Sequence, residues 1–255
     1  GEATVPDFRL KMAGNPVPLS TTFEVLVDGT NGNTILQPVH AKLGNTRFTT
    51  KGAVVKHEEK RNRLIDLKVA MPDGDLRDLL RLAAKGSPFM EGRISLNTTI
   101  DIPPLTGTVK EKLRLNGKFS VHDARLLRSN IQDQIDKLSR KGQGQPDNGE
   151  IDEVISRMSG SFQLENQRMT FRSLMFGVPG AHIQLAGDYD MGADTLDFHG
   201  TMRLLAKVSQ TMTGWKRWAL KPVDPFFEKN GAGTFLHIKV EGSPHKPDFG
   251  LDHGR

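Results

Sequence analysis

Cysteine is absent from this 255-residue chain, which excludes disulfide bonds, thiol nucleophiles and thiolate metal ligands. Tryptophan and tyrosine are scarce, at two and one residues, and this argues against a sugar-binding platform that stacks ligand rings on aromatic faces. No stretch approaches the ~18 consecutive apolar residues of a membrane span, and no signal peptide is recognisable. Because the chain begins at Gly1 without an initiator Met, we expect a processed or excised piece of a longer protein.

Neither sign of charge is in large excess, because 35 Lys and Arg residues stand against 30 Asp and Glu residues and give a formal net charge of +5. Mild basicity suits an anionic partner such as the headgroups of a membrane surface. The basic clusters within residues 56–63 and 137–141 are interleaved with acidic residues and have no aromatic stacking platform beside them. Nucleic acid is therefore not expected as a partner.

Strict alternation of apolar and polar residues, the pattern of half-buried strands, recurs along the chain. The 26 glycines add turns and strand bends. We predict a mainly β fold, a long, curved antiparallel sheet that forms an open groove or a sandwich-like half-pipe. We expect one domain over residues 1–255, with a division into 1–104 and 105–255 as the alternative. The alternating runs cover residues 23–27, 35–43, 65–71, 90–102, 113–121, 183–191 and 196–204.

Five glycines sit inside these patterns, each with an apolar residue two places to either side. They are Gly92, Gly117, Gly160, Gly187 and Gly200. Glycine in a strand interior marks a bend, a bulge or the close approach of another group to the backbone. Repeated on one face, it predicts a sheet that curves around its apolar side, although ordinary sandwich curvature gives the same pattern.

Three segments break the β pattern and predict two or three short helices. Residues 75–84 carry leucines at helical spacing, and Asp123 can cap a helix that runs to about Arg140. Residues 206–220, which hold both tryptophans, are ambiguous. Residues 141–150 form a polar, Gly-rich stretch that we expect to be a flexible loop.

The sequence shows no recognisable catalytic or metal-binding constellation, so we expect no enzyme, no metal and no cofactor. The acidic run of Asp188, Asp190, Asp194 and Asp197 lacks the closing Glu and the loop length of a calcium site. No histidine pair has the spacing of a helical zinc site. A nucleophile elbow, a paired-carboxylate motif and a Ser–Lys pair are also missing.

Four stretches occur in an order that carries a family resemblance. They are 88–104, which enters a long strand; 115–142, a Gly-x-Phe strand with a helix and a Leu-Ser-x-x-Gly ending; 160–200, with Gly-Ser-Phe-x-Leu and Leu-Asp-Phe-x-Gly; and 238–252, a closing strand with Gly then Pro. Residues 65–252 together resemble the AsmA-like family of bacterial envelope proteins, most closely its C-terminal region. The first 64 residues carry no clear signature.

The resemblance implies a periplasmic domain whose full-length parent is anchored in the inner membrane. It also implies a long β groove with an apolar lining that binds or conducts phospholipid and contributes to outer-membrane lipid homeostasis, with other envelope proteins as further partners. No catalytic residues carry over from the family.

The residues themselves point to the same architecture, because long one-sided strands offer more apolar area than short helices can cover. An acyl chain is one candidate cover, since each buried methylene gains roughly 0.8 kcal/mol. Plain core packing is the alternative for every position, and a closed β-sandwich that binds glycan or protein, a scaffold without lipid, and a hydrolase are the alternative functions. The candidate lining residues are Ile94, Leu96, Leu115, Phe119, Phe162, Leu185, Tyr189, Phe198 and Met202.

Overall fold

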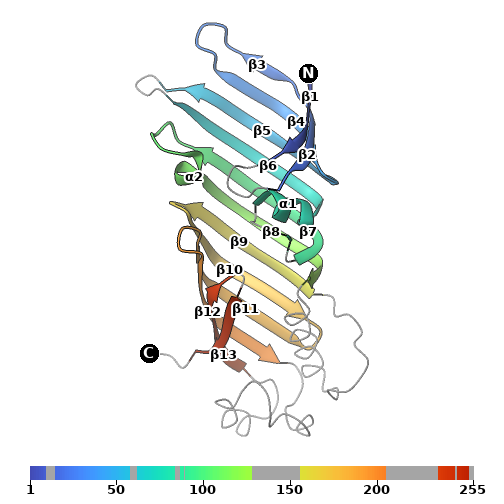
Figure 1. The fold of residues 1–255 in the computed structure, drawn as a ribbon, viewed down its shortest axis with the longest axis vertical. Coiled ribbons are helices and arrows are strands. Elements are labelled where there is room, and N and C mark those ends of the chain that lie inside the picture. Colours follow the sequence, from blue (N-terminus) through green and yellow to red (C-terminus); the bar gives the residue numbers. More distant parts are fainter. Residues whose placement is uncertain are drawn as a thin grey trace, which may run out of the picture.

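The computed structural model shows one large antiparallel sheet with two short helices (Figure 1). The sheet contains fourteen strands within the described part of the chain, with β1 and β14 at its two edges. The mainly β prediction is confirmed, in its single-sheet form. The structure describes residues 1–9, 15–57, 62–83, 87–88, 90–127, 156–204, 235–244 and 246–252.

The strands cross the sheet in chain order, so nearly every strand pairs with the strands before and after it in the sequence. The exception is at one edge, where β2 and β3 pair with successive parts of β4. The strands are β1 (Glu2–Phe8), β2 (Val17–Thr22), β3 (Val25–Val27), β4 (Thr34–Leu43), β5 (Thr46–Lys56), β6 (Arg63–Asp75), β7 (Met90–Ile102), β8 (Arg114–Leu126), β9 (Ser156–Glu165), β10 (Arg168–Val178), β11 (Ala181–Asp190), β12 (Thr195–Leu204), β13 (Phe235–Ser243) and β14 (Lys246–Leu251).

The two helices mark opposite ends of the strands. Helix α1 (Leu76–Ala83) joins β6 to β7, and helix α2 (Val109–Lys112) joins β7 to β8. We call these two ends of the strands the α1 rim and the α2 rim. The predicted helix over 75–84 is confirmed as α1, whereas α2 was not predicted. Its single turn is held by a capping box in which Thr108 and Glu111 bond each other's backbone N–H groups.

The helix predicted from Asp123 is wrong at its start. Asp123 lies inside β8, which continues to Leu126, and it adopts a left-handed φ of 54° beside an irregularity in the pairing with β7 and β9. Aspartate tolerates this conformation, so the strand bulges there and continues. The rest of that predicted helix, the segment 206–220 and the loop 141–150 lie outside the described residues.

The strand register places apolar side chains in rows across one face of the sheet, which we call the inner face. The row nearest the α1 rim begins with Ile94 opposite Val121, which lies opposite Met158. Polar side chains alternate onto the other face, the outer face. The same row then continues through Phe176, Ile183, Met202 and Leu236.

β-Bulges move residues between the two faces. The register of β4 against β5 shifts by one residue between Leu36 and Val39. As a result Ile35, which the alternation assigned to the same face as Val39, lies on the outer face and is 50% exposed. Its cross-strand neighbour in β3 is Leu26, which is exposed as well.

Helix α1 packs on the inner face at the α1 rim. It brings Leu76, with Leu79 and Leu80 around it, onto a buried cluster that includes Met71 and Val121. Val121 is completely buried. A second buried cluster lies at the same rim between β10 and β13, built around Val178, Ala181, Leu204 and Leu236. The strands are therefore anchored by packed apolar side chains mainly along this one rim.

Candidate apolar binding face

All nine predicted lining residues lie on the inner face. The pairing of Leu96 with Phe119, and of Leu115 with Leu164, joins the first half of the set across β7, β8 and β9. The pairing of Ile183 with Met202, and of Tyr189 with Leu196, extends the face across β11 and β12. Ile94 and Phe198 are buried, at 6% exposure each, and the other seven are half-buried.

Four phenylalanine rings form a continuous cluster in the middle of this face. Phe119 lies 6.2 Å from Phe162 and 6.4 Å from Phe171, measured between ring centroids, and Phe171 lies 5.6 Å from Phe198. Tilted and edge-on rings at these separations attract one another by about 0.5–1.5 kcal/mol per pair beyond their area burial. We call these four rings, Phe119, Phe162, Phe171 and Phe198, the aromatic floor of the inner face.

The predicted glycines make room for these rings. Gly117 pairs with Phe162, Gly160 with Phe119, and Gly187 lies between Phe171 and Phe198. A Cβ on Gly117 would come within 2.8 Å of the Phe162 ring, and a Cβ on Gly160 within 3.1 Å of the Phe119 ring. At these positions the glycine lets a neighbouring ring approach the backbone closely, which is one of the three alternatives that the glycine pattern left open.

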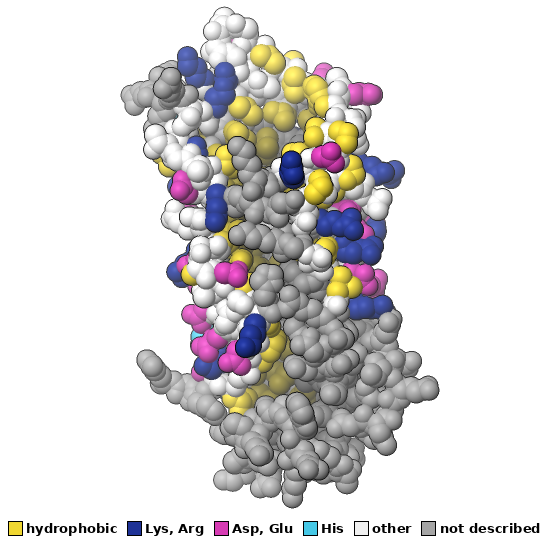
Figure 2. Space-filling model, viewed as in Figure 1, with side chains coloured by type: hydrophobic (Ala, Val, Ile, Leu, Met, Phe, Trp, Pro, Cys, Tyr) yellow, Lys and Arg dark blue, Asp and Glu magenta, His cyan; other side chains and the backbone are white. Residues whose placement is uncertain are grey.

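Figure 2 shows hydrophobic side chains along the length of the molecule in the same view, with Lys, Arg, Asp and Glu mostly at the margins. Among the described elements, only α1 lies over the inner face, at the α1 rim of β6 to β8. Neither described helix has the length and apolar composition that a membrane span requires.

The alternation analysis missed several residues of this face, most of them in β10. Met169 and Phe171 point inward, but a one-residue shift in the pairing after Phe171 brings Leu174 and Phe176 inward in the opposite phase. A bulge breaks strict alternation, so the segment does not read as one strand. The sequence signal that could have revealed β10 is a pair of short alternating runs, one on each side of the bulge, that are offset from each other by one residue.

The tyrosine closes the inner face at the α2 rim. The Tyr189 hydroxyl donates a hydrogen bond of 2.8 Å to Asp194 Oδ1 in the turn between β11 and β12. Burial, followed by this bond and the nearby carboxylate charge, raises the pKa of Tyr189 to about 12. The neighbouring Asp190 accepts the N–H groups of Gly192 and Ala193, which lower its pKa and hold the turn.

Because Tyr189 is the single tyrosine, its ionisation can be followed directly by absorbance near 295 nm. The folded-state pKa of about 12 exceeds the unfolded value of about 10, so the folded protein holds this proton more tightly. Its contribution to stability is complete below pH 10 and is lost as pH rises from about 10 to 12. Asp194→Asn, which tolerates the left-handed φ at this position, should lower the midpoint. Asn keeps an acceptor oxygen but carries no charge, so an unchanged midpoint in the variant would contradict the Asp194 carboxylate charge as a cause.

The acidic run has several structural partners, and one of them, Arg168, contacts both Asp188 and Asp190. Besides the roles of Asp190 and Asp194, Asp188 accepts the hydroxyl of Thr170, and Asp197 contacts His199 at 3.0 Å. The described residues contain no group of three or more His, Asp or Glu arranged to hold a metal ion.

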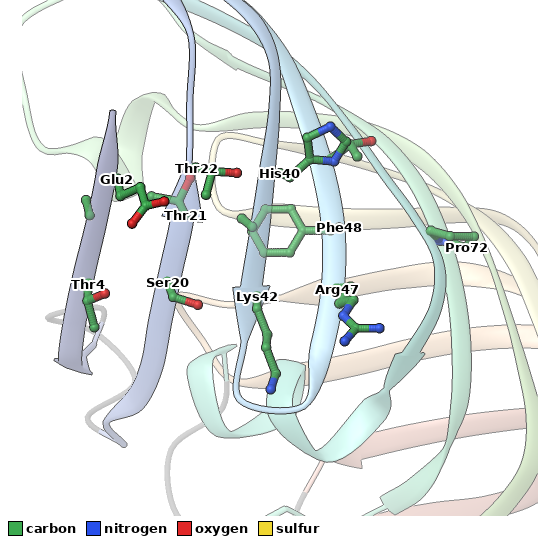
Figure 3. Close-up of a pocket in the computed structure, with 13 residues that line it drawn as sticks. Glu2, Thr4, Ser20, Thr21, Thr22, His40, Lys42, Arg47, Phe48 and Pro72 are labelled. Atoms are coloured by element: carbon green, nitrogen blue, oxygen red, sulfur yellow. The ribbon is translucent and has the colours of Figure 1, made fainter.

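Two hollows lie among residues that the sequence analysis did not single out. One, of about 390 Å³, is lined by residues of β1, β2, β4 and β5 and by Pro72 of β6. Figure 3 shows the basic side chains His40, Lys42 and Arg47 of β4 and β5 among its lining residues. The larger, of about 940 Å³, lies near the α1 rim of β8 to β13. Both are lined largely by outer-face side chains, so they are distinct from the aromatic floor.

Comparison with known proteins does not identify the chain. It matches no protein-family model, no curated protein and no solved structure. The AsmA-like resemblance thus stays a prediction that rests on the four sequence stretches.

Proposed function

We propose that this domain is a non-enzymatic lipid-binding module that holds phospholipid acyl chains on the inner face, within the bacterial envelope. The observation that carries the proposal is the continuity of the apolar rows, which cross from β6 to β13 on one face of a single sheet. Seven of the nine predicted lining residues keep part of their surface accessible. Such a face gains about 25 cal/mol for each Å² that an acyl chain covers.

The arrangement of charge supports an amphiphilic ligand. Apolar side chains line the inner face, whereas the charged groups Lys56 and Arg63 pair across β5 and β6 at the α2 rim. Both are exposed, and Arg63 also donates a hydrogen bond to the Gly32 carbonyl oxygen in the β3–β4 turn. An acyl chain on the apolar rows would leave its phosphate close to water and within reach of such cations. The periplasmic location and the transport of phospholipid between membranes rest on the family resemblance.

Leu115→Glu tests the proposal. A carboxylate in the middle of the apolar rows makes acyl burial unfavourable, and we expect the amount of co-purified phospholipid to fall by about tenfold or more. The measurement is native mass spectrometry with lipid extraction on protein purified from bacterial membranes. Asn116→Glu is the matched control, because the neighbouring side chain is exposed on the outer face.

Three outcomes would count against lipid binding. A wild-type domain that purifies as a stable, lipid-free protein would mean that protein covers the inner face, and the scaffold alternative would replace the proposal. Equal lipid content in Leu115→Glu and Asn116→Glu would place the lipid elsewhere. Loss of the circular-dichroism signal in Leu115→Glu alone would show that this position belongs to the core.

A further inference from the structure

The outer face near the α1 rim carries a row of cationic and imidazole side chains that alternation alone does not reveal. Arg157 pairs with Gly177, Gly177 pairs with His182, and His182 pairs with Arg203. His122 lies at the end of the same row, next to the strand position of Arg157. The row therefore collects two arginines and two histidines from β8, β9, β11 and β12.

These side chains line the hollow of about 940 Å³. Gly177 contributes no side chain in the middle of the row, and the His182 ring lies against this position, since a Cβ there would come within 3.5 Å of His182 Nδ1. The adjacent row on the same face supplies polar groups that can donate or accept hydrogen bonds. These are Ser120, Ser159, Gln184 and Thr201. The volume lies within the ~300–1,000 Å³ typical of small-molecule sites.

The arginines of this row differ from Arg114 and Arg168, which pair with carboxylates on the same face. At the α2 rim, Arg114 contacts Glu165 at 3.1 Å and Arg168 contacts Asp190 at 3.5 Å. In the described part of the chain, neither Arg157 nor Arg203 has a carboxylate partner. Arg157 and Arg203 lie three strands apart in the row, with Gly177 and His182 between them, and Asp123 also lines the hollow. An anion held between the two guanidinium groups would supply each of them with an opposite charge.

Two large apolar side chains stand on the same polar face beside the row. Met175, on the adjacent row, is 51% exposed, and Phe235, opposite Arg203, is 58% exposed. Both line the hollow. An inorganic anion gains nothing from contact with these apolar side chains. An anion that carries an apolar group can bury that group against Met175 and Phe235 while the arginines bind its charge.

We infer that this hollow binds the phosphate group of a small amphiphile, with Arg157 and Arg203 as the phosphate-binding residues and Met175 and Phe235 against its apolar part. Guanidinium groups donate paired hydrogen bonds that match phosphate oxygens. The site lies on the face opposite the aromatic floor and does not depend on acyl chains being held there. Phosphate can arrive as a free ion or as a lipid headgroup, and the experiment separates the two.

The test is isothermal titration calorimetry of the intact chain with two probes, inorganic phosphate and dihexanoyl phosphatidic acid below its micelle concentration. We expect the short-chain lipid to bind more tightly than inorganic phosphate. Arg157→Gln/Arg203→Gln should weaken lipid binding by about 100-fold or more, since each charged hydrogen-bonding group contributes roughly tenfold or more. Arg168→Gln, which removes a carboxylate-paired arginine from the same face, should leave it unchanged. Phe235→Ser should weaken the lipid but not inorganic phosphate.

Equal affinities for both probes, unaffected by Phe235→Ser, would overturn the amphiphile and leave a free-phosphate site. Binding that survives in Arg157→Gln/Arg203→Gln, or no binding in the wild type, would overturn the site altogether. Thermal melting provides an independent readout, because removing two unpaired like charges should not lower the melting temperature. Phosphatidate should raise the melting temperature of the wild type but not that of the double variant. Leu115→Glu separates this inference from the lipid-binding proposal, since it should leave calorimetric binding in the hollow intact.

Discussion

Gly200→Ala is expected to destabilise the sheet by about 2–3 kcal/mol, among the largest effects available from a single methyl group. A Cβ at this position would lie 1.9 Å from the Gln184 carbonyl oxygen and 2.8 Å from Leu185 Cα. Both obstructing atoms belong to the backbone of β11, so no side-chain rotation can relieve the clash. The two strands would have to separate, which weakens the hydrogen bonds between β11 and β12. Urea denaturation, with hydrogen–deuterium exchange of these two strands, measures the loss.

Gly29→Ala is the matched control for this prediction. A Cβ on Gly29 meets no atom within 4 Å, so the same substitution should change the free energy of unfolding by no more than about 0.5 kcal/mol. If both variants are equally stable, the backbones of β11 and β12 do not approach each other at Gly200 as closely as described. Exchange that accelerates in distant strands but not in β11 and β12 would contradict this close approach as well.

Asp78→Ala is expected to cost about 2–4 kcal/mol, because it removes two hydrogen bonds to a buried carboxylate. Asp78 in the first turn of α1 is 4% exposed. Its Oδ2 accepts the Asn45 N–H at 2.8 Å and the Thr46 hydroxyl at 2.9 Å, which tie the helix to the β4–β5 turn. The Thr46 hydroxyl also accepts the Asp75 N–H, so removal of the carboxylate disturbs the start of the helix too. Urea denaturation and amide exchange in α1 report the effect.

Asp73→Ala makes the same chemical change five residues earlier. Asp73 pairs with Arg93 on the surface, where both side chains are more than half exposed, so its loss should cost less than about 1 kcal/mol. Asp78→Asn retains one acceptor oxygen and should fall between the two. Equal stability of Asp78→Ala and Asp73→Ala would mean that the contacts of α1 with the β4–β5 turn do not hold the helix in place.

Alternation predicted the inner face where strands are regular. Across β7 and β8, for example, every second residue from Ile94 to Ile102 and from Leu115 to Val121 points inward, because the side-chain period of a strand is two. The same logic failed wherever a bulge intervenes, as at Ile35 and in β10, since an extra residue reverses the phase without any strong mark in the composition. Asp123 failed for a related reason. The preference of Asp123 for capping a helix depends on its nearest sequence neighbours alone. The pairing of β8 with β7 and β9 involves residues far away in the sequence, and its free energy outweighs that local preference.

The outer-face hollow could not be predicted because it depends on register. Arg157, His182 and Arg203 lie in three different strands, and only the hydrogen-bond pairing aligns them in one row. A shift of one residue in any pairing would send one of them to the inner face. The exposed Phe235 shows the same limit, since its sequence neighbour Leu236 is 5% exposed and belongs to a buried cluster.

Because the strands follow one another across the sheet in chain order, the hydrogen bonds that stabilise each strand come from its immediate neighbours. From β4 to β13 each strand pairs with a neighbour on either side, as repeats do in a solenoid, whereas β1, β3 and β14 each pair with one strand only. Order should then be lost from the edges inward, and strands far apart sense each other only through those between them. A long ligand lying along the rows from β6 to β13 would contact many strands at once. Its binding would therefore couple the stability of strands that do not touch one another, so that the sheet would unfold more cooperatively.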